Sequence, residues 1–277
     1  MASIQVVDDM GFRVELETPP TRIISLVPSW TETLFALGLG ERVVGVTKFC
    51  IEPAEKLEAV TRIGGTKNPD VRKIVALKPD LIIANAEENR REDVERMRAQ
   101  GLAVFTTYPR TVPGAVESLL KMARAAACES EADLMAREIT RTVSEVEASV
   151  GVWSRLRIRA FCPIWKNPWM AFNADTYAHD VLRMMGFNNV FASAGERYPM
   201  TTIDQALERN PDIVILPDEP YEFGERDLDE LRTTLPAPLA RRTLIVSGRD
   251  LHWYGYHMVA GLKSLEARLA RVRAAVL

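Results

Sequence analysis

Two segments of this chain repeat the same pattern 132 residues apart. Residues 79–87 and 211–219 each consist of Pro-Asp, a run of apolar residues and a polar loop that carries a glutamate. A second pair of segments, residues 22–30 and 157–165, is similar at an offset of 135 residues. Repeats of ~20 to 50 residues are typical of solenoids. The much longer repeat here predicts two similar α/β halves that face each other with a ligand between them.

The order of apolar segments in the first half predicts an α/β fold. Short, β-branched runs bounded by turn residues are typical of strands buried on both faces, and we expect them at 22–27, 43–46, 81–84 and 103–106. Amphipathic segments between them predict helices at 29–38, 70–77 and 88–100. This alternation predicts a parallel, doubly wound sheet. Residues 1–20 precede it as a predicted hairpin.

The middle of the chain lacks strand signals and predicts two consecutive helices. The first spans 111–127, and the second begins near Ser130, a candidate N-cap, and ends near Val152. We therefore expect an N-terminal α/β lobe at 1–110, a helical connector at 111–152 and a C-terminal α/β lobe at 153–277, which ends in a helix at 256–277. The long second helix predicts a rigid strut between the lobes.

Composition limits the partners and the compartment. The net charge is −3, and lysine and arginine are scattered among acidic residues, so nucleic acid and anionic lipid are not expected partners. No run of ~18 apolar residues and no secretory signal is recognisable. We expect either a cytoplasmic protein or one whose signal has been removed. Cys50, Cys128 and Cys162 have no metal-site spacing, which favours free thiols.

Ligands of open parallel sheets bind at the carboxyl ends of the strands, and the loops expected there are rich in aromatic residues. Flat apolar ligands are bound by such side chains. The candidate ligand-binding residues are Trp30, Phe49, Glu87, Asn89, Trp165, Trp169, Arg197, Tyr198, Glu219, Trp253 and Tyr254.

Some of these candidates have alternative interpretations. Trp30 begins a predicted helix and is also consistent with packing inside the lobe, and a glutamate in a loop is usually only solvated. Because Glu87 and Glu219 follow equivalent strands, we expect them on opposite sides of the mouth of one cleft, where they accept hydrogen bonds from the ligand or from groups such as Asn89 and Arg197.

Signatures of catalysis are sparse. The serines lack a Gly-x-Ser-x-Gly motif, and the three histidines do not form a metal pattern. Gly64-Gly65-Thr66 lacks the spacing of a phosphate loop. The sequence thus predicts a binding protein that requires no catalytic residue, metal or cofactor of its own. The alternative is an enzyme that uses Glu87 and Glu219 as an acid–base pair.

Several motifs together resemble the iron-siderophore and cobalamin substrate-binding proteins of ABC importers. The resemblance extends over residues 22–277 and rests on the segments 20–32, 64–70 and 74–81. Within that family the chain is most similar to the helical backbone metal receptors, through residues 49–53, 165–169, 173–177 and 253–255.

The resemblance implies a class III periplasmic-binding-protein fold, in which two Rossmann-like lobes are joined by one long helix. It also implies a non-enzymatic protein that holds cobalamin, haem or a ferric siderophore in the interlobe cleft and delivers it to an ABC permease. In the cobalamin receptors a glutamate docks onto the permease, and this chain has Arg72 at that position. A cytoplasmic carrier of a corrinoid or other metal chelate, without a permease, is therefore the alternative.

Overall fold

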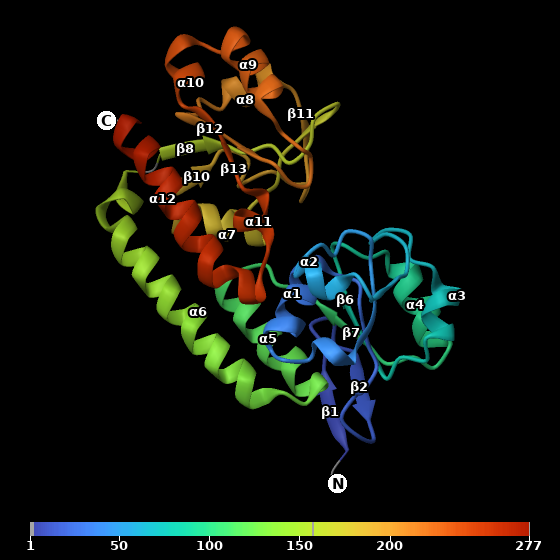
Figure 1. Ribbon diagram of the computed structural model, residues 1–277. Coiled ribbons are helices and arrows are strands. Elements are labelled where there is room, and N and C mark those ends of the chain that lie inside the picture. The colour runs from blue at the N-terminus through green and yellow to red at the C-terminus, as the bar shows by residue number, and fades with distance from the viewer. Residues whose placement is uncertain (1–2, 157, 277) are drawn as a thin grey trace. The chain divides into compact units, whose positions relative to one another are not determined.

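The chain divides into two units, each built on its own parallel sheet. The computed structural model describes residues 3–156 and 158–276 and is shown in Figure 1. The first unit comprises residues 1–109, 113–139 and 254–257, and the second comprises 110–112, 140–253 and 258–277. The predicted fold class, α/β with two parallel-sheet lobes, is thus confirmed.

The first unit contains a five-stranded parallel sheet in the order β5-β4-β3-β6-β7. Its strands are β3 (Ile23–Ser25), β4 (Val43–Val46), β5 (Thr61–Arg62), β6 (Leu81–Asn85) and β7 (Val104–Thr107). The helices of this unit are α1 (Pro28–Ala36), η1 (Gly40–Arg42), α2 (Ala54–Leu57), α3 (Val71–Ala76), α4 (Arg91–Ala99) and α5 (Val112–Ala126). All five residues of β6 are buried, as expected for a central strand covered on both faces.

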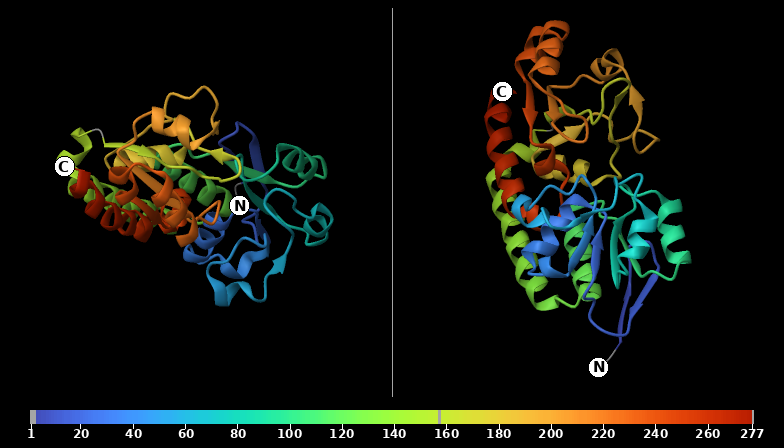
Figure 2. Two further views of the ribbon diagram at one scale, coloured as in Figure 1. Left: turned by 90° about the horizontal axis from the view of Figure 1, so that it is seen from above. Right: turned by 45° about the vertical axis from the view of Figure 1, so that its right-hand side comes forward.

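The predicted N-terminal hairpin is confirmed as β1 (Ile4–Val7) and β2 (Arg13–Leu16), which pair antiparallel. Asp8 fixes the turn: its Oδ1 accepts from the backbone N–H groups of Met10 and Phe12, and its Oδ2 accepts from Arg98 at 2.8 Å. Figure 2 shows β1 and β2 in dark blue, extending from the sheet of their unit toward the N-terminus. The turn is thus anchored while the strands extend outward.

The second unit contains a four-stranded parallel sheet in the order β10-β8-β12-β13. Its strands are β8 (Ile158–Phe161), β10 (Phe187–Asn189), β12 (Ile213–Pro217) and β13 (Thr243–Val246), and a small antiparallel pair is formed by β9 (Trp169–Met170) and β11 (Met200–Thr201). The helices are η2 (Gly151–Arg155), α7 (Tyr177–Met184), α8 (Ile203–Glu208), α9 (Glu225–Thr234), α10 (Ala237–Arg241), α11 (Gly248–His252) and α12 (Met258–Val276).

The long helix α6 (Glu129–Val150) has residues in both units, because the boundary falls between Ile139 and Thr140. In the second unit α12 lies alongside it (Figures 1 and 2), with Lys263 Nζ 2.7 Å from Glu145 Oε2 and Ser149 Oγ 3.0 Å from Glu266 Oε1. Ser130 was wrong as the N-cap, since α6 begins one residue earlier and includes it. The final helix is preceded by a short 3-10 turn, η3 (Gly255–His257).

The internal repeat exists in three dimensions, with one correction to its register. Strands β6 and β12 are related by the predicted 132-residue offset. However, Ile23 lies opposite Leu81 whereas Ala160 lies opposite Ile213, so the strands β3 and β8 correspond at an offset of 137 residues rather than 135. Arg157, the predicted counterpart of Arg22, lies outside the described residues.

The Pro-Asp motif explains this register. In the first unit Asp80 Oδ2 accepts from the N–H of Arg22 at 2.9 Å, and in the second Asp212 Oδ2 accepts from the N–H of Arg159 at 2.8 Å. Each arginine side chain also donates to a carbonyl at the end of the helix that precedes the Pro-Asp motif. Arg22 donates to the carbonyl of Leu77, after α3, and Arg159 donates to that of Asn210, after α8. The same turn therefore fixes the same pair of central strands in both units.

Candidate functional site

The carboxyl ends of the parallel strands carry most of the candidate residues, in two separate groups of loops. In the first unit these loops follow β3, β4 and β6, and in the second they follow β8, β10, β12 and β13. Parallel strands place their carboxyl ends at one edge of a sheet, where ligands of open α/β sheets bind.

Trp30 lies in the core of the first unit. Its side chain is 0% exposed, and its Nε1 donates to Thr107 Oγ1 at 2.8 Å. Its ring packs against Tyr254, with the centroids 5.0 Å apart. The structure therefore places Trp30 in the packing role that the sequence left as an alternative, where it supports Tyr254.

Tyr254 begins a four-residue segment, Tyr254–His257, that belongs to the first unit, whereas the chain on either side of this segment belongs to the second. The next residue, Gly255, has φ +78°, and a Cβ there would lie 2.2 Å from Thr33 Oγ1, so only glycine fits this approach. The Tyr254 hydroxyl donates to Glu88 Oε1 at 3.2 Å. Burial raises the pKa of Tyr254, and the nearby carboxylates of Glu88 and Glu87 raise it further, so the phenol stays protonated and acts as a donor.

The other candidates of the first unit differ in exposure. Phe49 is 50% exposed, and Lys48 Nζ lies 4.9 Å from its ring centroid. Asn89 is buried and shapes its loop, since its Oδ1 accepts from the N–H of Asn85 at 2.8 Å and its Nδ2 donates to the carbonyl of Thr66 at 3.0 Å. Glu87 is half-buried, and its carbonyl accepts a hydrogen bond from Lys67 Nζ.

An aromatic cluster forms in the second unit where the loops after β8 and β12 meet. Trp165 is 42% exposed and lies 5.6 Å from Tyr221 in an edge-on arrangement. Trp169 stacks on Phe223 at 5.8 Å, and Tyr221 packs against Phe223 at 4.6 Å. The half-buried rings of Trp169 and Tyr221 pack on the buried ring of Phe223, and Tyr221 in turn supports the exposed indole of Trp165. We call Trp165, Trp169, Tyr221 and Phe223 the aromatic cluster.

Lys166 ties this cluster to α9. Its Nζ lies 2.7 Å from Asp227 Oδ1 and 2.7 Å from Glu230 Oε2, and its side chain is largely buried. Burial lowers the pKa of Lys166, but its hydrogen bonds to the two carboxylates outweigh that effect and raise the pKa overall. The lysine therefore stays charged and holds the loop between the two tryptophans in place.

Arg197 and Tyr198 belong to a second feature of this unit, a carboxylate shared by two arginines. Arg197 Nη1 and Arg110 Nη1 each lie 2.9 Å from an oxygen of Asp175. The guanidinium of Arg197 also lies 5.9 Å from the ring centroid of Tyr198. Glu219 is half-buried, and its backbone packs so closely on Gly248 that a Cβ there would lie 2.4 Å from Glu219 N.

Trp253 is only 7% exposed. Its carbonyl accepts from the Tyr177 hydroxyl at 3.5 Å, and the Arg249 guanidinium lies 5.6 Å from its ring. The neighbouring His252 packs edge-on against Phe172, and its Nε2 is buried with no hydrogen-bond partner among the described residues. Burial lowers the pKa of His252 to about 4.

Lys166 and Tyr221 lie in loops that the sequence places at the carboxyl ends of strands, but they were not among the candidate residues, and Phe223 was missed. Lys166 lies between two of the candidate tryptophans, and Tyr221 follows Glu219 by two residues, so proximity along the sequence was the available signal. Within residues 3–156 and 158–276, no group of three or more His, Cys, Asp or Glu side chains could hold a metal ion. No helix in those ranges has the length and apolar character that a membrane span requires.

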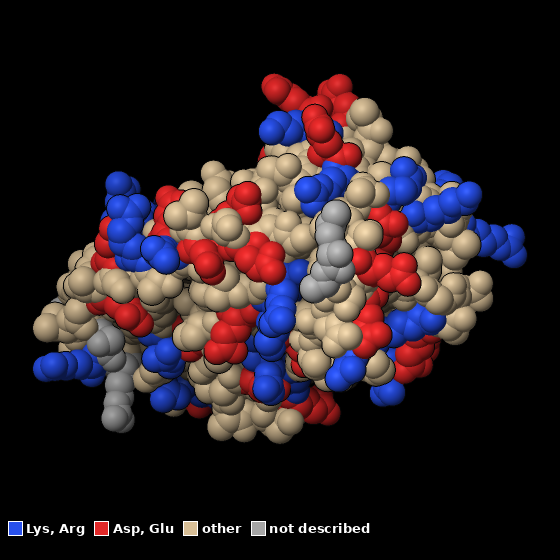
Figure 3. All heavy atoms as spheres, turned by 90° about the horizontal axis from the view of Figure 1, so that it is seen from below, with Lys and Arg blue, Asp and Glu red and all other residues tan. Residues whose placement is uncertain are grey.

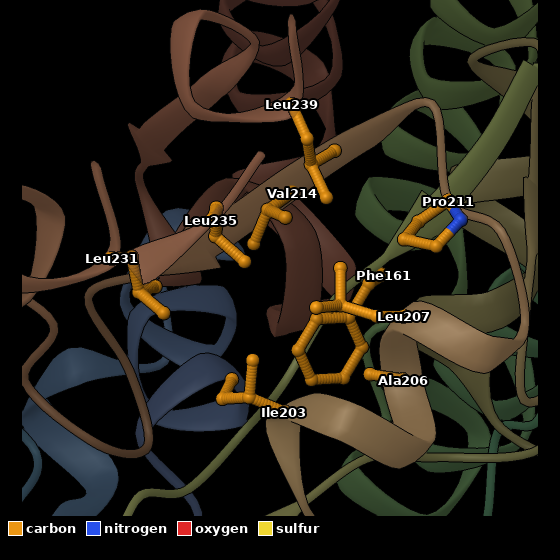
Figure 4. Close-up of a pocket in the computed structure, with 9 residues that line it drawn as sticks. All are labelled: Phe161, Ile203, Ala206, Leu207, Pro211, Val214, Leu231, Leu235 and Leu239. Carbon is orange, nitrogen blue, oxygen red and sulfur yellow. The ribbon is translucent and has the colours of Figure 1, made fainter. Parts of the chain in front are cut away.

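The apolar hollow drawn in Figure 4 belongs to the core of the second unit and not to this site. It is lined by Phe161, Ile203, Ala206, Leu207, Pro211, Val214, Leu231, Leu235 and Leu239. These side chains point toward one another, and they leave no room for even a water molecule. Ligand pockets have volumes of ~300 to 1,000 Å³, so this gap does not hold a ligand.

Comparison with known proteins gives consistent matches over most of the chain. The family model described as "Periplasmic binding protein" matches residues 23–237. The vitamin B12-binding protein of Vibrio parahaemolyticus is 26% identical over 198 residues, which cover 71% of this chain and 70% of the relative. That of Photorhabdus laumondii is 28% identical over 208 residues, which cover 74% of each chain.

Solved structures show the same fold. The periplasmic vitamin B12-binding protein BtuF of Vibrio cholerae has a TM-score of 0.78 at 21% identity, and the match covers 92% of this chain and 98% of that one. The periplasmic heme-binding protein RhuT of Roseiflexus sp. RS-1 has a TM-score of 0.76 at 20% identity, with 92% and 99% covered. These relatives are all named as binding proteins rather than as enzymes.

Proposed function

The chain belongs to the periplasmic binding protein family, and on that premise we propose that it binds a metal chelate and presents it to an ABC importer. The observation that carries this proposal is the similarity to vitamin B12-binding proteins over about 70% of both chains. The ligands under consideration are cobalamin, haem and ferric siderophores, and a corrinoid is favoured. The relatives matched by sequence are vitamin B12-binding proteins, whereas the heme-binding neighbours share the fold at lower identity.

The aromatic cluster supports a ligand of this kind. An exposed indole held by packed aromatic rings offers a flat apolar surface, and a macrocyclic chelate has flat apolar faces to place on it. We propose that the ligand lies between the two loop groups, with Trp165 on one side and Phe49 on the other. Arg197, Tyr198, Glu87 and Glu219 would then meet the polar groups at the ligand's edge.

Binding of three defined chelates tests the proposed function. Purified protein is titrated with hydroxocobalamin, haemin and a ferric catecholate, and binding is followed by isothermal titration calorimetry. We expect saturable binding of at least one ligand at a stoichiometry of one, with hydroxocobalamin the tightest. Absence of binding for all three would refute the proposal, and preference for haemin or the ferric chelate would refute the favoured ligand.

A carrier that works without a permease is the second candidate, and Arg72 favours it. Arg72 lies on the exposed surface of α3, two residues after the N-cap Asp70, where the family resemblance implies a docking glutamate. An arginine there would repel the permease arginine with which such a glutamate pairs. Co-purification with the permease encoded in the same genome distinguishes a receptor of an ABC importer from a carrier that works without a permease. Stable association, unaffected by Arg72→Glu, would rule out this reading of Arg72.

A further inference from the structure

The first unit has an open groove between its N-terminal hairpin and helix α5. The groove has a volume of about 530 Å³ and lies apart from the loops that follow the strands of the parallel sheet. Residues from β1, β2 and the middle of α5 line it, among them Gln5, Val7, Arg13, Leu120, Lys121 and Arg124. Neither the fold of the unit nor the proposed chelate site accounts for it.

Two apolar side chains are exposed in this groove. Val7 is 51% exposed and Leu120 is 36% exposed. Leu120 and Arg124 are four residues apart on α5, so they occupy one face of that helix. A partner that covers Val7 and Leu120 would remove apolar surface from water, which is a general source of binding free energy.

The charged side chains in the lining of the groove are basic, and two of the three lie beside carboxylates. Three of its lining residues are basic and none is acidic. Arg124 forms no ion pair with any residue in the described part of the chain, and it is exposed. Arg13 lies 3.4 Å from Glu15, but both side chains are more than half exposed, so that pair holds the arginine only weakly. Lys121 Nζ lies 2.9 Å from Asp9 Oδ1.

The backbone of the hairpin offers a further binding element. Among the described residues, β1 and β2 pair only with each other, so each strand has an edge without a strand partner. Such an edge accepts an added strand through main-chain hydrogen bonds. Because β1 has four residues, at ~3.3 Å per residue its edge spans about 13 Å, which matches a short extended peptide.

We propose that this groove binds an extended, acidic peptide segment of a partner protein, which adds to the edge of the hairpin. Its acidic side chains would pair with Arg13, Arg124 and Lys121, and its apolar side chains would cover Val7 and Leu120. Nucleic acid fits less well, since the groove is short and partly apolar. Figure 3, which views the molecule from below, also shows acidic and basic side chains interspersed on that face rather than one broad basic surface.

Fluorescence anisotropy with two labelled peptides tests the proposal. One peptide alternates glutamate with valine, and the other alternates lysine with valine. We expect the acidic peptide to bind and the basic one not to bind. Raising the ionic strength from about 0.05 M to about 0.3 M, which shortens the screening length, should weaken binding several-fold. Equal binding of both peptides, or no binding of either, would overturn the proposal.

Two charge reversals locate the site. Arg13→Glu and Arg124→Glu should each weaken binding of the acidic peptide about tenfold or more, because each replaces an attraction with a repulsion. Arg96→Glu is the matched control, because Arg96 lies on α4 of the same unit and is 62% exposed. This variant should bind the peptide like the wild type. Circular dichroism confirms that the variants are folded.

Two further measurements identify the occupant. Amide exchange at residues 4–7 should slow when the acidic peptide binds, as expected for strand addition. Sedimentation equilibrium should show a monomer at the concentrations used. If the chain instead self-associates and Arg13→Glu abolishes the association, the groove binds a second copy and the proposal is wrong. Normal chelate binding by both charge-reversal variants would show that this groove and the chelate site are independent.

Discussion

At the scale of single residues, the buried His252 imposes a pH dependence on stability. Its folded-state pKa of about 4 lies below the ordinary value of 6.5, because burial disfavours the imidazolium. As the pH falls below about 6.5 the unfolded chain takes up a proton that the folded chain does not, so stability is lost. Between pH 7 and pH 5 this one residue should lower the free energy of unfolding by about 2 kcal/mol.

The variant His252→Leu tests this effect, because it keeps an apolar contact with Phe172 and removes the titrating group. Urea unfolding at pH 7 and pH 5 should show a smaller acid-induced loss of stability for the variant than for the wild type. His179→Leu serves as a comparison, since burial also lowers the pKa of His179 but that group is only half-buried. An equal loss in the wild type and in His252→Leu would contradict the assignment.

The tryptophans should separate into ligand contacts and core residues. Trp165 is 42% exposed, so Trp165→Ala should weaken chelate binding by about 1 to 3 kcal/mol with little change in stability. Trp253 is 7% exposed, so Trp253→Ala should mainly lower stability, by about 3 to 5 kcal/mol. The variant Trp153→Ala, in η2, is the control, and it should leave chelate binding unchanged.

Calorimetric titration and urea unfolding of the three variants give both quantities. If Trp165→Ala binds normally, the aromatic cluster is not the ligand surface.

The contrast between Trp165 and Trp253 also shows what sequence could predict about this site. Both tryptophans lie near the ends of strands in the sequence, and this position identified them as candidates. Exposure depends on which rings from other loops cover each indole, and nothing in the neighbouring residues specifies that.

At the scale of secondary-structure elements, the two Pro-Asp turns act as matched anchors. Asp80 accepts three hydrogen bonds from Thr21 and Arg22. Burial raises the pKa of Asp80, but these hydrogen bonds outweigh it and the pKa is lowered overall. The stabilisation is therefore present above the ordinary pKa of aspartate and is lost as the pH falls through the lowered value.

The substitution Asp80→Asn should lower stability at pH 7 by about 1 kcal/mol, since this carboxylate is half-buried and still in contact with solvent. The difference from the wild type should shrink as the pH approaches 3. Asp212→Asn is the equivalent change in the second unit, where Asp212 accepts from Arg159. Urea unfolding at several pH values between 7 and 3 gives the stability of both variants and of the wild type. A pH-independent difference for Asp80→Asn would show that charge is not what stabilises the turn.

The elements themselves were largely predictable, and the exceptions have physical causes. The predicted strands at 43–46 and 81–84 correspond to β4 and β6, because continuous apolar runs between turn residues specify buried strands. The register of β8 was not predictable. The Pro-x-Trp motifs at 28–30 and 163–165 suggest an offset of 135 residues between the two halves, but the hydrogen bond from the N–H of Arg159 to Asp212 sets the strand at an offset of 137. The helix expected at 88–100 begins only at Arg91, because Asn85 Oδ1 accepts from the N–H groups of Glu87 and Glu88 and holds them in a turn.

At the scale of the whole molecule, the chain passes between its two units five times, and one of these crossings lies inside the long helix α6. The boundary at 139–140 falls within α6, which is continuous from Glu129 to Val150. A helix bends sharply only at proline, at glycine–serine pairs or where its hydrogen bonds are interrupted, and α6 contains no proline or glycine. A hinge at this crossing would therefore have to break helical hydrogen bonds.

We accordingly expect little change in the arrangement of the units when a chelate binds. Small-angle X-ray scattering with and without saturating hydroxocobalamin should give radii of gyration that agree within error. A variant with Thr140→Gly and Arg141→Gly in α6 provides the comparison, because glycine lowers helix stability by ~1 kcal/mol per residue and should permit a measurable change. Large compaction of the wild-type protein on binding would show that the crossings at 109–113 and 253–258, and not α6, control the motion.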